Sequence, residues 1–204
     1  NHGMFKALLF LNAGSLLHAT GTQDLNRTGG LLRWMPLTAV TACIGSLSIS
    51  GVPLFNGFAS KWHIYFTCIK GSASVPYLAV CGLVAILTSA ITLALFIKFY
   101  GASFLSRSSS VVQDRWATRG QLEVGTLMQL PQAFLALACV LLGIWPTLGT
   151  GLLAAALRSS HPVFLGDAVA AAGAPSGTWL GITLADGSAR FAPLGIAALL
   201  ASGC

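Results

Sequence analysis

The sequence has very few charged residues for its length. Aspartate, glutamate, lysine and arginine make up 8% of the 204 residues, whereas a soluble domain carries about 25%. A water-facing surface cannot be built from so few charges, and apolar residues account for 55% of the chain. The composition therefore excludes an ordinary soluble domain and indicates a protein whose solvent is lipid.

Acidic residues are especially scarce. All five fall in segments that we interpret as loops: Asp24, Asp114, Glu123, Asp167 and Asp186. The hydrophobic segments therefore contain no carboxylate. Lysine and arginine number 11, for a net charge of +6, but they lie mostly between hydrophobic blocks. Nucleic-acid binding needs a clustered basic patch, so we expect no nucleic-acid partner.

Several motifs that would indicate chemistry are absent. The five cysteines form no Cys-x-x-Cys pair, so we interpret them as small buried hydrophobic residues rather than disulfides or zinc ligands. The sequence has no nucleotide-binding glycine loop and no plausible pairing of a nucleophile with a base. We therefore expect no catalytic residue, no cofactor and no metal in this chain.

The two ends of the sequence indicate a fragment. The chain starts with asparagine inside a helical pattern, and we expect no signal peptide because no charged segment leads into a short apolar core. Residues 191–204 end within another apolar run. We expect this run to begin a further, truncated span.

Long hydrophobic runs dominate what is present. A membrane-spanning helix needs about 20 mostly apolar residues. Four runs qualify, at about residues 3–20, 37–69, 76–99 and 127–150. The second is too long for one crossing and is interrupted at Gly51 and Pro53, which both disfavour helix. The prediction is an all-α membrane protein, a polytopic transmembrane helix bundle with one discontinuous helix.

We expect residues 1–150 to form the transmembrane domain and residues 151–190 to form a loop of polar and small residues. The loops at 20–36 and 100–126 would lie on the same side of the membrane. Together with the adjoining end of the third hydrophobic run, these two loops carry six lysines and arginines. The segments expected on the other side of the membrane carry three. Because cytoplasmic loops are enriched in these residues, both loops are expected in the cytoplasm.

Two lysines stand inside hydrophobic runs, Lys6 and Lys61. A lysine at the centre of a membrane helix costs about 2.5–3.5 kcal/mol on insertion scales, so such residues usually mark function. Lys61 follows Pro53 by eight residues. A helix break frees backbone groups that protein or water must satisfy, and transporters place ions at such breaks. The break and Lys61 together predict a proton-carrying site.

His2 precedes Lys6 by four residues, so the two share a helix face, and a histidine suits proton relay. His63 follows Lys61 by two residues and points to another side of the helix. A plainer interpretation is that Lys61 snorkels to the membrane interface beside Trp62 and Tyr65. The chain would then be a structural membrane anchor.

Four stretches resemble one known family. HGMFKALLFLNAGSLLHA is similar to the H-x-x-x-K-x-L-L-F-L-x-x-G-S helix of the antiporter-like subunits of respiratory complex I, NADH:quinone oxidoreductase. These subunits are related to Mrp cation/proton antiporters and to the membrane subunits of energy-converting hydrogenases. TGGLLRWMP at 28–36, ISGVPLFNGFASK at 49–61 and ALACVLLGIWP at 136–146 follow in the family's order.

The resemblance implies a subunit that moves protons across a bacterial or archaeal cell membrane beside other membrane subunits. It implies that Lys61 is the terminal proton carrier on a broken helix, that Lys6 and His2 are relay residues, and that the first broken helix lies upstream. Several relatives carry glutamate where this chain has Lys61, and Asn12 replaces a small residue, a change expected to alter packing. The alternatives that remain are part of an Mrp-type Na⁺/H⁺ antiporter and a hydrogenase-type membrane anchor.

Overall fold

The computed structural model describes residues 1–160, 176–178, 181–183, 190–191, 196, 198 and 201–202. Within these residues the chain is largely helical. The α-helices are α1 (His2–Thr20), α2 (Pro36–Ser50), α3 (Asn56–Gly71), α4 (Tyr77–Tyr100), α5 (Ser110–Arg119), α6 (Thr126–Ile144) and α7 (Pro146–Ser160). Two short 3-10 turns, η1 (Leu25–Arg27) and η2 (Leu31–Arg33), join α1 to α2, and a π-helical turn, η3 (Gly101–Leu105), extends α4.

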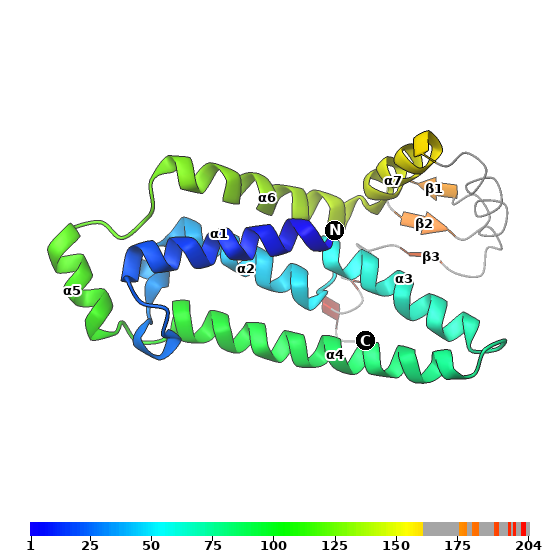
Figure 1. The fold of residues 1–204 in the computed structure, drawn as a ribbon, viewed down its shortest axis with the longest axis horizontal. Coiled ribbons are helices and arrows are strands. Elements are labelled where there is room, and N and C mark those ends of the chain that lie inside the picture. The colour runs from blue at the N-terminus through cyan, green and yellow to red at the C-terminus, as the bar shows by residue number, and fades with distance from the viewer. Residues whose placement is uncertain are drawn as a thin grey trace.

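The long helices lie side by side as an elongated bundle (Figure 1). α1, α2 and α6 pack against one another, and α4 packs along both α2 and α3. α4 is therefore a continuous helix that runs past the point where α2 ends and α3 begins. α5 lies across one end of the bundle, beside the segment that joins α1 to α2 (Figure 1).

Two helical stretches, Tyr77–Leu105 and Thr126–Ile144, are long and apolar enough to cross a membrane by length and composition among the described residues. Little of the first stretch is buried inside the bundle. Its exposed side chains include Val80, Leu83, Leu87 and Leu95. Apolar surface of this extent must be covered by lipid or by other protein.

Local sequence explains where the helices stop. Pro36 and Pro146 occupy first turns, where the missing N–H costs nothing. Pro146 also ends α6 at Ile144, since the residue before a proline disfavours the α conformation. The single run expected at 127–150 is consequently divided between α6 and α7.

Other departures from the expected organisation lie outside the hydrophobic runs. α5 forms within the segment expected to be a loop, where Ser109 caps its first turn by accepting a hydrogen bond from the Val112 N–H at 3.3 Å. α7 extends to Ser160, ten residues into the expected loop at 151–190. Beyond it, β1 (Ser176–Thr178), β2 (Gly181–Thr183) and β3 (Arg190–Phe191) form an antiparallel sheet in the order β1-β2-β3. Most of residues 161–204 lie outside the described residues, and of the further span expected at 191–204 the structure describes only residues 191, 196, 198 and 201–202, with residue 191 in β3.

α6 approaches the α2–α3 connection very closely. A Cβ added at Gly143 would lie 2.5 Å from the backbone of Phe55, with the Leu54 carbonyl also in conflict. Contacts this short force a shift, and the neighbouring atoms are backbone rather than a mobile side chain. Gly143 is therefore required by the packing of α6 on the break.

We predict that Gly143→Ala destabilises the protein by about 1–3 kcal/mol, the usual cost of overpacking. Thermal unfolding in detergent measures the effect. Gly151→Ala is the matched control, because Gly151 is an exposed helical glycine with nothing within 4 Å of an added Cβ. Equal unfolding temperatures for the two variants would contradict the packing argument.

Candidate functional site

Residues 51–55 separate α2 from α3. Gly51 adopts the left-handed conformation, with φ 76°. Its N–H donates to the Ser48 carbonyl at 3.1 Å, and the Val52 N–H donates to the Leu47 carbonyl at 3.1 Å. This pair of bonds is a Schellman motif, which ends a helix and satisfies two of its last four carbonyls.

Lys61 satisfies the other two carbonyls. Its Nζ donates to the Ile49 carbonyl at 3.0 Å and to the Ser50 carbonyl at 3.1 Å. The ammonium thus sits at the C-terminus of α2, where the helix dipole places partial negative charge. Lys61 is partly buried, and its amine bonds across the break to the preceding helix.

Glycines leave the space that the Lys61 side chain needs to reach the end of α2. An added Cβ on Gly51 would lie 2.6 Å from Cδ and 3.3 Å from Nζ of Lys61. An added Cβ on Gly57, in the first turn of α3, would collide with the Ser48 carbonyl. Leu54, between them, has φ 79°, which is uncommon for a residue with a side chain. The backbone of the break is therefore both close-packed and locally strained.

Pro53 lies in the connection itself, outside both helices. The break expected at Gly51 and Pro53 thus falls where the two helices separate.

The predicted relay residues lie on α1, on the exposed side of the described chain. Lys6 lines a hollow of about 250 Å³ with Ile49 and Phe96. Ile49 therefore borders both lysines, because its carbonyl accepts from Lys61. His2 is exposed and packs edge-to-face on Phe5, with ring centroids 5.1 Å apart. The structure brings Lys6 close to the end of α2 and leaves His2 one turn away along α1.

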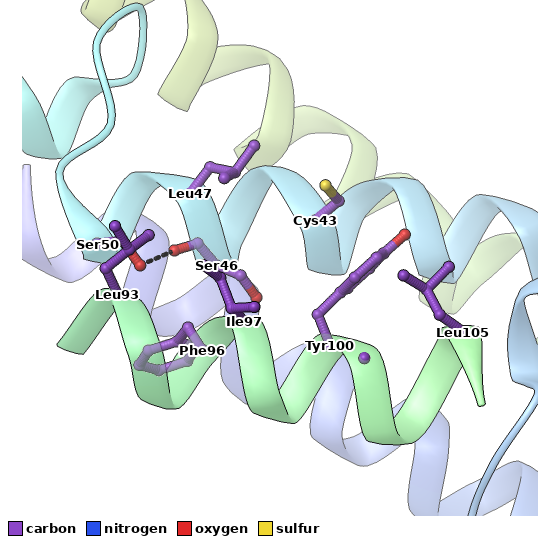
Figure 2. Close-up of a pocket in the computed structure, with 10 residues that line it drawn as sticks. Cys43, Ser46, Leu47, Ser50, Leu93, Phe96, Ile97, Tyr100 and Leu105 are labelled. Carbon is purple, nitrogen blue, oxygen red and sulfur yellow. Dashed lines mark hydrogen bonds between the residues drawn. The ribbon is translucent and has the colours of Figure 1, made fainter. Parts of the chain in front are cut away.

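A separate cavity of about 160 Å³ lies between α2 and the end of α4 (Figure 2). It is lined mainly by apolar residues, including Leu47, Leu93 and Phe96. The Ser50 hydroxyl, which borders it, is bonded to the Ser46 carbonyl at 2.6 Å (Figure 2). This cavity offers an ion few polar groups, so it is not the polar region of the site.

The polar region missed by sequence reasoning lies on the other face of α2. Thr41 donates to the side-chain oxygen of Asn12 at 2.8 Å and lies 3.4 Å from Gln132 Oε1. Gln132 Nε2 donates to the Ser15 hydroxyl at 2.6 Å. These four residues are almost fully buried between α1, α2 and α6. Asn12, expected only to alter packing, is thus part of a buried polar network.

Comparison with known proteins gives a family match for the first part of the sequence. Residues 1–92 match the family model described as NADH:quinone oxidoreductase/Mrp antiporter, TM. Those residues contain α1, the break and Lys61. The chain is therefore similar to this transmembrane family over residues 1–92, just under half of its length. The match confirms the resemblance drawn from the helix motif and the break motif.

Curated relatives come from several branches of the family. The chain is 36% identical over 146 residues to a probable K⁺/H⁺ antiporter component of Rhizobium meliloti (strain 1021), covering 72% of this chain and 14% of that protein. It is 35% identical over 149 residues to hydrogenase-4 component B of Escherichia coli (strain K12), covering 71% and 21%. The chain thus spans less than a quarter of either relative's length.

Solved structures share the fold. A chain from the membrane-bound sulfane sulfur reductase, an archaeal respiratory membrane complex, superposes with a TM-score of 0.74 at 28% identity, covering 99% of this chain and 29% of that one. A chain of the Mrp complex from Dietzia sp. DQ12-45-1b superposes with a TM-score of 0.60 at 22% identity, covering 79% and 36%. The second similarity concerns the fold alone.

The contact between Gly51 and Lys61 gives a prediction with an internal control. Gly51→Ala combines the left-handed strain of a Cβ, about 1–2 kcal/mol, with displacement of the lysine stem. Gly120→Ala introduces the strain alone, since Gly120 has φ 67° and open space around an added Cβ. We expect Gly51→Ala to lower stability in chemical denaturation more than Gly120→Ala does. Equal losses would show that Lys61 does not occupy this position.

Proposed function

We propose that this chain is part of a proton-translocating, antiporter-like membrane subunit, in which Lys61 carries the proton at a discontinuous transmembrane helix formed by α2 and α3. The observation that carries the proposal is the pair of hydrogen bonds from Lys61 Nζ to the carbonyls of Ile49 and Ser50. Similarity to the transmembrane family over residues 1–92 supports it.

The chemistry follows from what surrounds the amine. The negative end of the α2 dipole faces the Lys61 amine in place of a carboxylate, since the hydrophobic segments contain none. Arrival of a second positive charge near Ile49 would oppose the charged form of this amine, because like charges disfavour each other's charged forms. Lys6 borders the same residue, so its protonation would drive release of the proton from Lys61.

His2 would deliver protons to Lys6 from the upstream part of the longer protein. Both residues lie on one face of α1, four residues apart. Both are exposed in the described chain. We infer that the upstream helices of the longer protein cover this face and complete the relay.

We also propose that the end of the bundle formed by the α1–α2 connection and α5 faces the cytoplasm, as the count of lysines and arginines in the loops predicts. The α1–α2 connection and α5 meet at one end of the bundle, where Arg119 donates to the His18 carbonyl at 3.1 Å. Trp34 and Trp116 stack there with ring centroids 4.3 Å apart. Tryptophans and arginines are enriched at membrane interfaces, and this end would face the cytoplasm.

A second candidate is monovalent cation/proton exchange, favoured by relatives named as K⁺/H⁺ and Na⁺/H⁺ antiporter subunits. Under either candidate the chain works with other membrane subunits, as the relatives from multi-subunit complexes do. The two differ in whether an imposed Na⁺ or K⁺ gradient drives proton movement. We expect proton uptake in vesicles to proceed without either gradient; strict dependence on one would favour exchange.

Replacing Lys61 tests the proposal directly. Lys61→Met keeps the apolar stem and removes the charge, so we expect proton uptake by vesicles containing the assembled complex to fall at least tenfold. Lys70→Met is the matched control, because Lys70 is an exposed lysine in the last turn of the same helix. Wild-type uptake by Lys61→Met, with assembly intact, would refute the assignment and favour a structural anchor.

Lys6 supplies an independent prediction. If it drives proton release from Lys61, Lys6→Met should slow uptake while leaving the Lys61 hydrogen bonds in place. Initial uptake rates at several imposed potentials measure the loss. A rate equal to wild type would remove Lys6 from the relay without affecting the role of Lys61.

A further inference from the structure

Glu123 lies at the end of α2 opposite Lys61. One oxygen of its carboxylate accepts the Leu37 N–H at 3.1 Å, and the other accepts the Thr38 hydroxyl at 2.6 Å. The neighbours of Glu123 in sequence, Leu122 and Val124, are each 3% exposed and belong to the core. The carboxylate is therefore held in place by buried flanking residues while remaining partly accessible to solvent.

Glu123 differs from the other acids that the structure describes. Asp24 accepts from the Asn26 N–H in an exposed turn, and the Asp114 side chain is exposed on α5. Glu123, by contrast, bonds to a hydrophobic helix 85 residues away in sequence. Of the carboxylates that the structure describes, it is the one that bonds to the first turn of α2.

A polar seam continues from this carboxylate along α2. Thr38, Thr41, Gly45 and Ser48 follow at intervals of three or four residues and share one face of the helix. The Thr41 hydroxyl lies within 3.1 Å of the Thr38 carbonyl. From Thr41 the seam includes the buried side chains described above: Asn12, Gln132 and Ser15.

Beside the break, the polar seam includes two side-chain oxygens that lack a hydrogen-bond partner. The hydroxyl of Ser48 and the side-chain oxygen of Asn56 are buried and have no hydrogen-bond partner. Both residues are fully inaccessible. Buried polar atoms are nearly always satisfied, by ordered water where protein offers no partner. The two oxygens lie beside the buried Cys139 thiol, which is only a weak donor, so they leave bonding capacity that water next to the helix break would fill.

An apolar contact separates the two halves of the seam. Leu8 is fully buried and belongs to a cluster with Phe5 and Ala136. An added Cβ on Gly45 would lie 3.4 Å from the Leu8 side chain, which places Leu8 beside the seam between Thr41 and Ser48. A short apolar stretch between wet regions can interrupt conduction until it is hydrated.

We propose that Glu123 exchanges protons between solvent at the α5 end of the bundle and this seam, which leads along α2 towards Lys61. From Thr38 to Ser48 the seam would span about 15 Å along α2. The inference rests on the proposed function. It adds a titratable group at the outer end of the route.

The exchange conserves protons. A proton from water binds the Glu123 oxygen that now accepts from Thr38, and the neutral carboxyl then donates to the Thr38 oxygen. This reverses the direction of the present hydrogen bond. The Thr38 oxygen takes the proton as its own hydroxyl proton passes on to the next acceptor along α2, which restores the carboxylate. The competing explanation is that Glu123 only caps the N-terminus of α2.

Substitutions at Glu123 separate the two roles. Glu123→Gln retains an acceptor for the Leu37 N–H and loses the titratable group, whereas Glu123→Asp retains a carboxylate. In vesicles holding the assembled complex, we expect proton uptake to fall at least tenfold in Glu123→Gln and to recover in part in Glu123→Asp. Asp114→Asn, which changes an exposed acid on α5, should match wild type.

Wild-type uptake by Glu123→Gln would overturn the inference and leave a capping role. If Lys61→Met abolishes uptake in the same assay, the proposed function stands despite that failure. Should Glu123→Gln fail to assemble, Thr41 provides the second test. Thr41→Ser keeps the hydroxyl and should transport, whereas the isosteric Thr41→Val should lose at least tenfold; equal rates for this pair would also overturn the inference.

Discussion

The ammonium of Lys61 and the last two carbonyls of α2 hold the helix break together. A helix that ends inside a hydrophobic bundle must satisfy four carbonyls without help from bulk water. Here the Schellman motif at Gly51 satisfies two, and Lys61 satisfies the remaining two. The lysine is thus both the charge in the site and part of the termination of α2. Loss of its proton would leave two N–H groups for these carbonyls and remove the charge that strengthens both bonds.

The surrounding architecture preserves that contact. α4 runs unbroken past the break and packs on both α2 and α3. Gly57 lets α3 approach the Ser48 carbonyl, and Gly143 lets α6 approach Phe55. The break is therefore enclosed by backbone on several sides. Such enclosure explains how a strained residue such as Leu54 persists there.

Local sequence patterns predicted the long helices and where α2 ends, because Gly51 and Pro53 act on the backbone immediately around them. The same kind of signal at Pro146 was overlooked inside an apolar run, and the Ser109 cap of α5 was hidden in a polar segment. The partners of Lys61 could not be predicted, since they lie 11 and 12 residues away across a turn. The contact of Glu123 with Thr38 was harder still to predict, because it depends on how α6 and the segment before it pack on α2.

The position of Lys61 in the intact membrane complex tests this account most directly. A high-resolution cryo-electron microscopy structure of the complete complex in a lipid nanodisc would show both the depth of Nζ and its partners. The account predicts Nζ at hydrogen-bonding distance from the Ile49 and Ser50 carbonyls, within the hydrocarbon layer and beside ordered water. An Nζ lying among lipid headgroups, with those carbonyls bonded elsewhere, would contradict it.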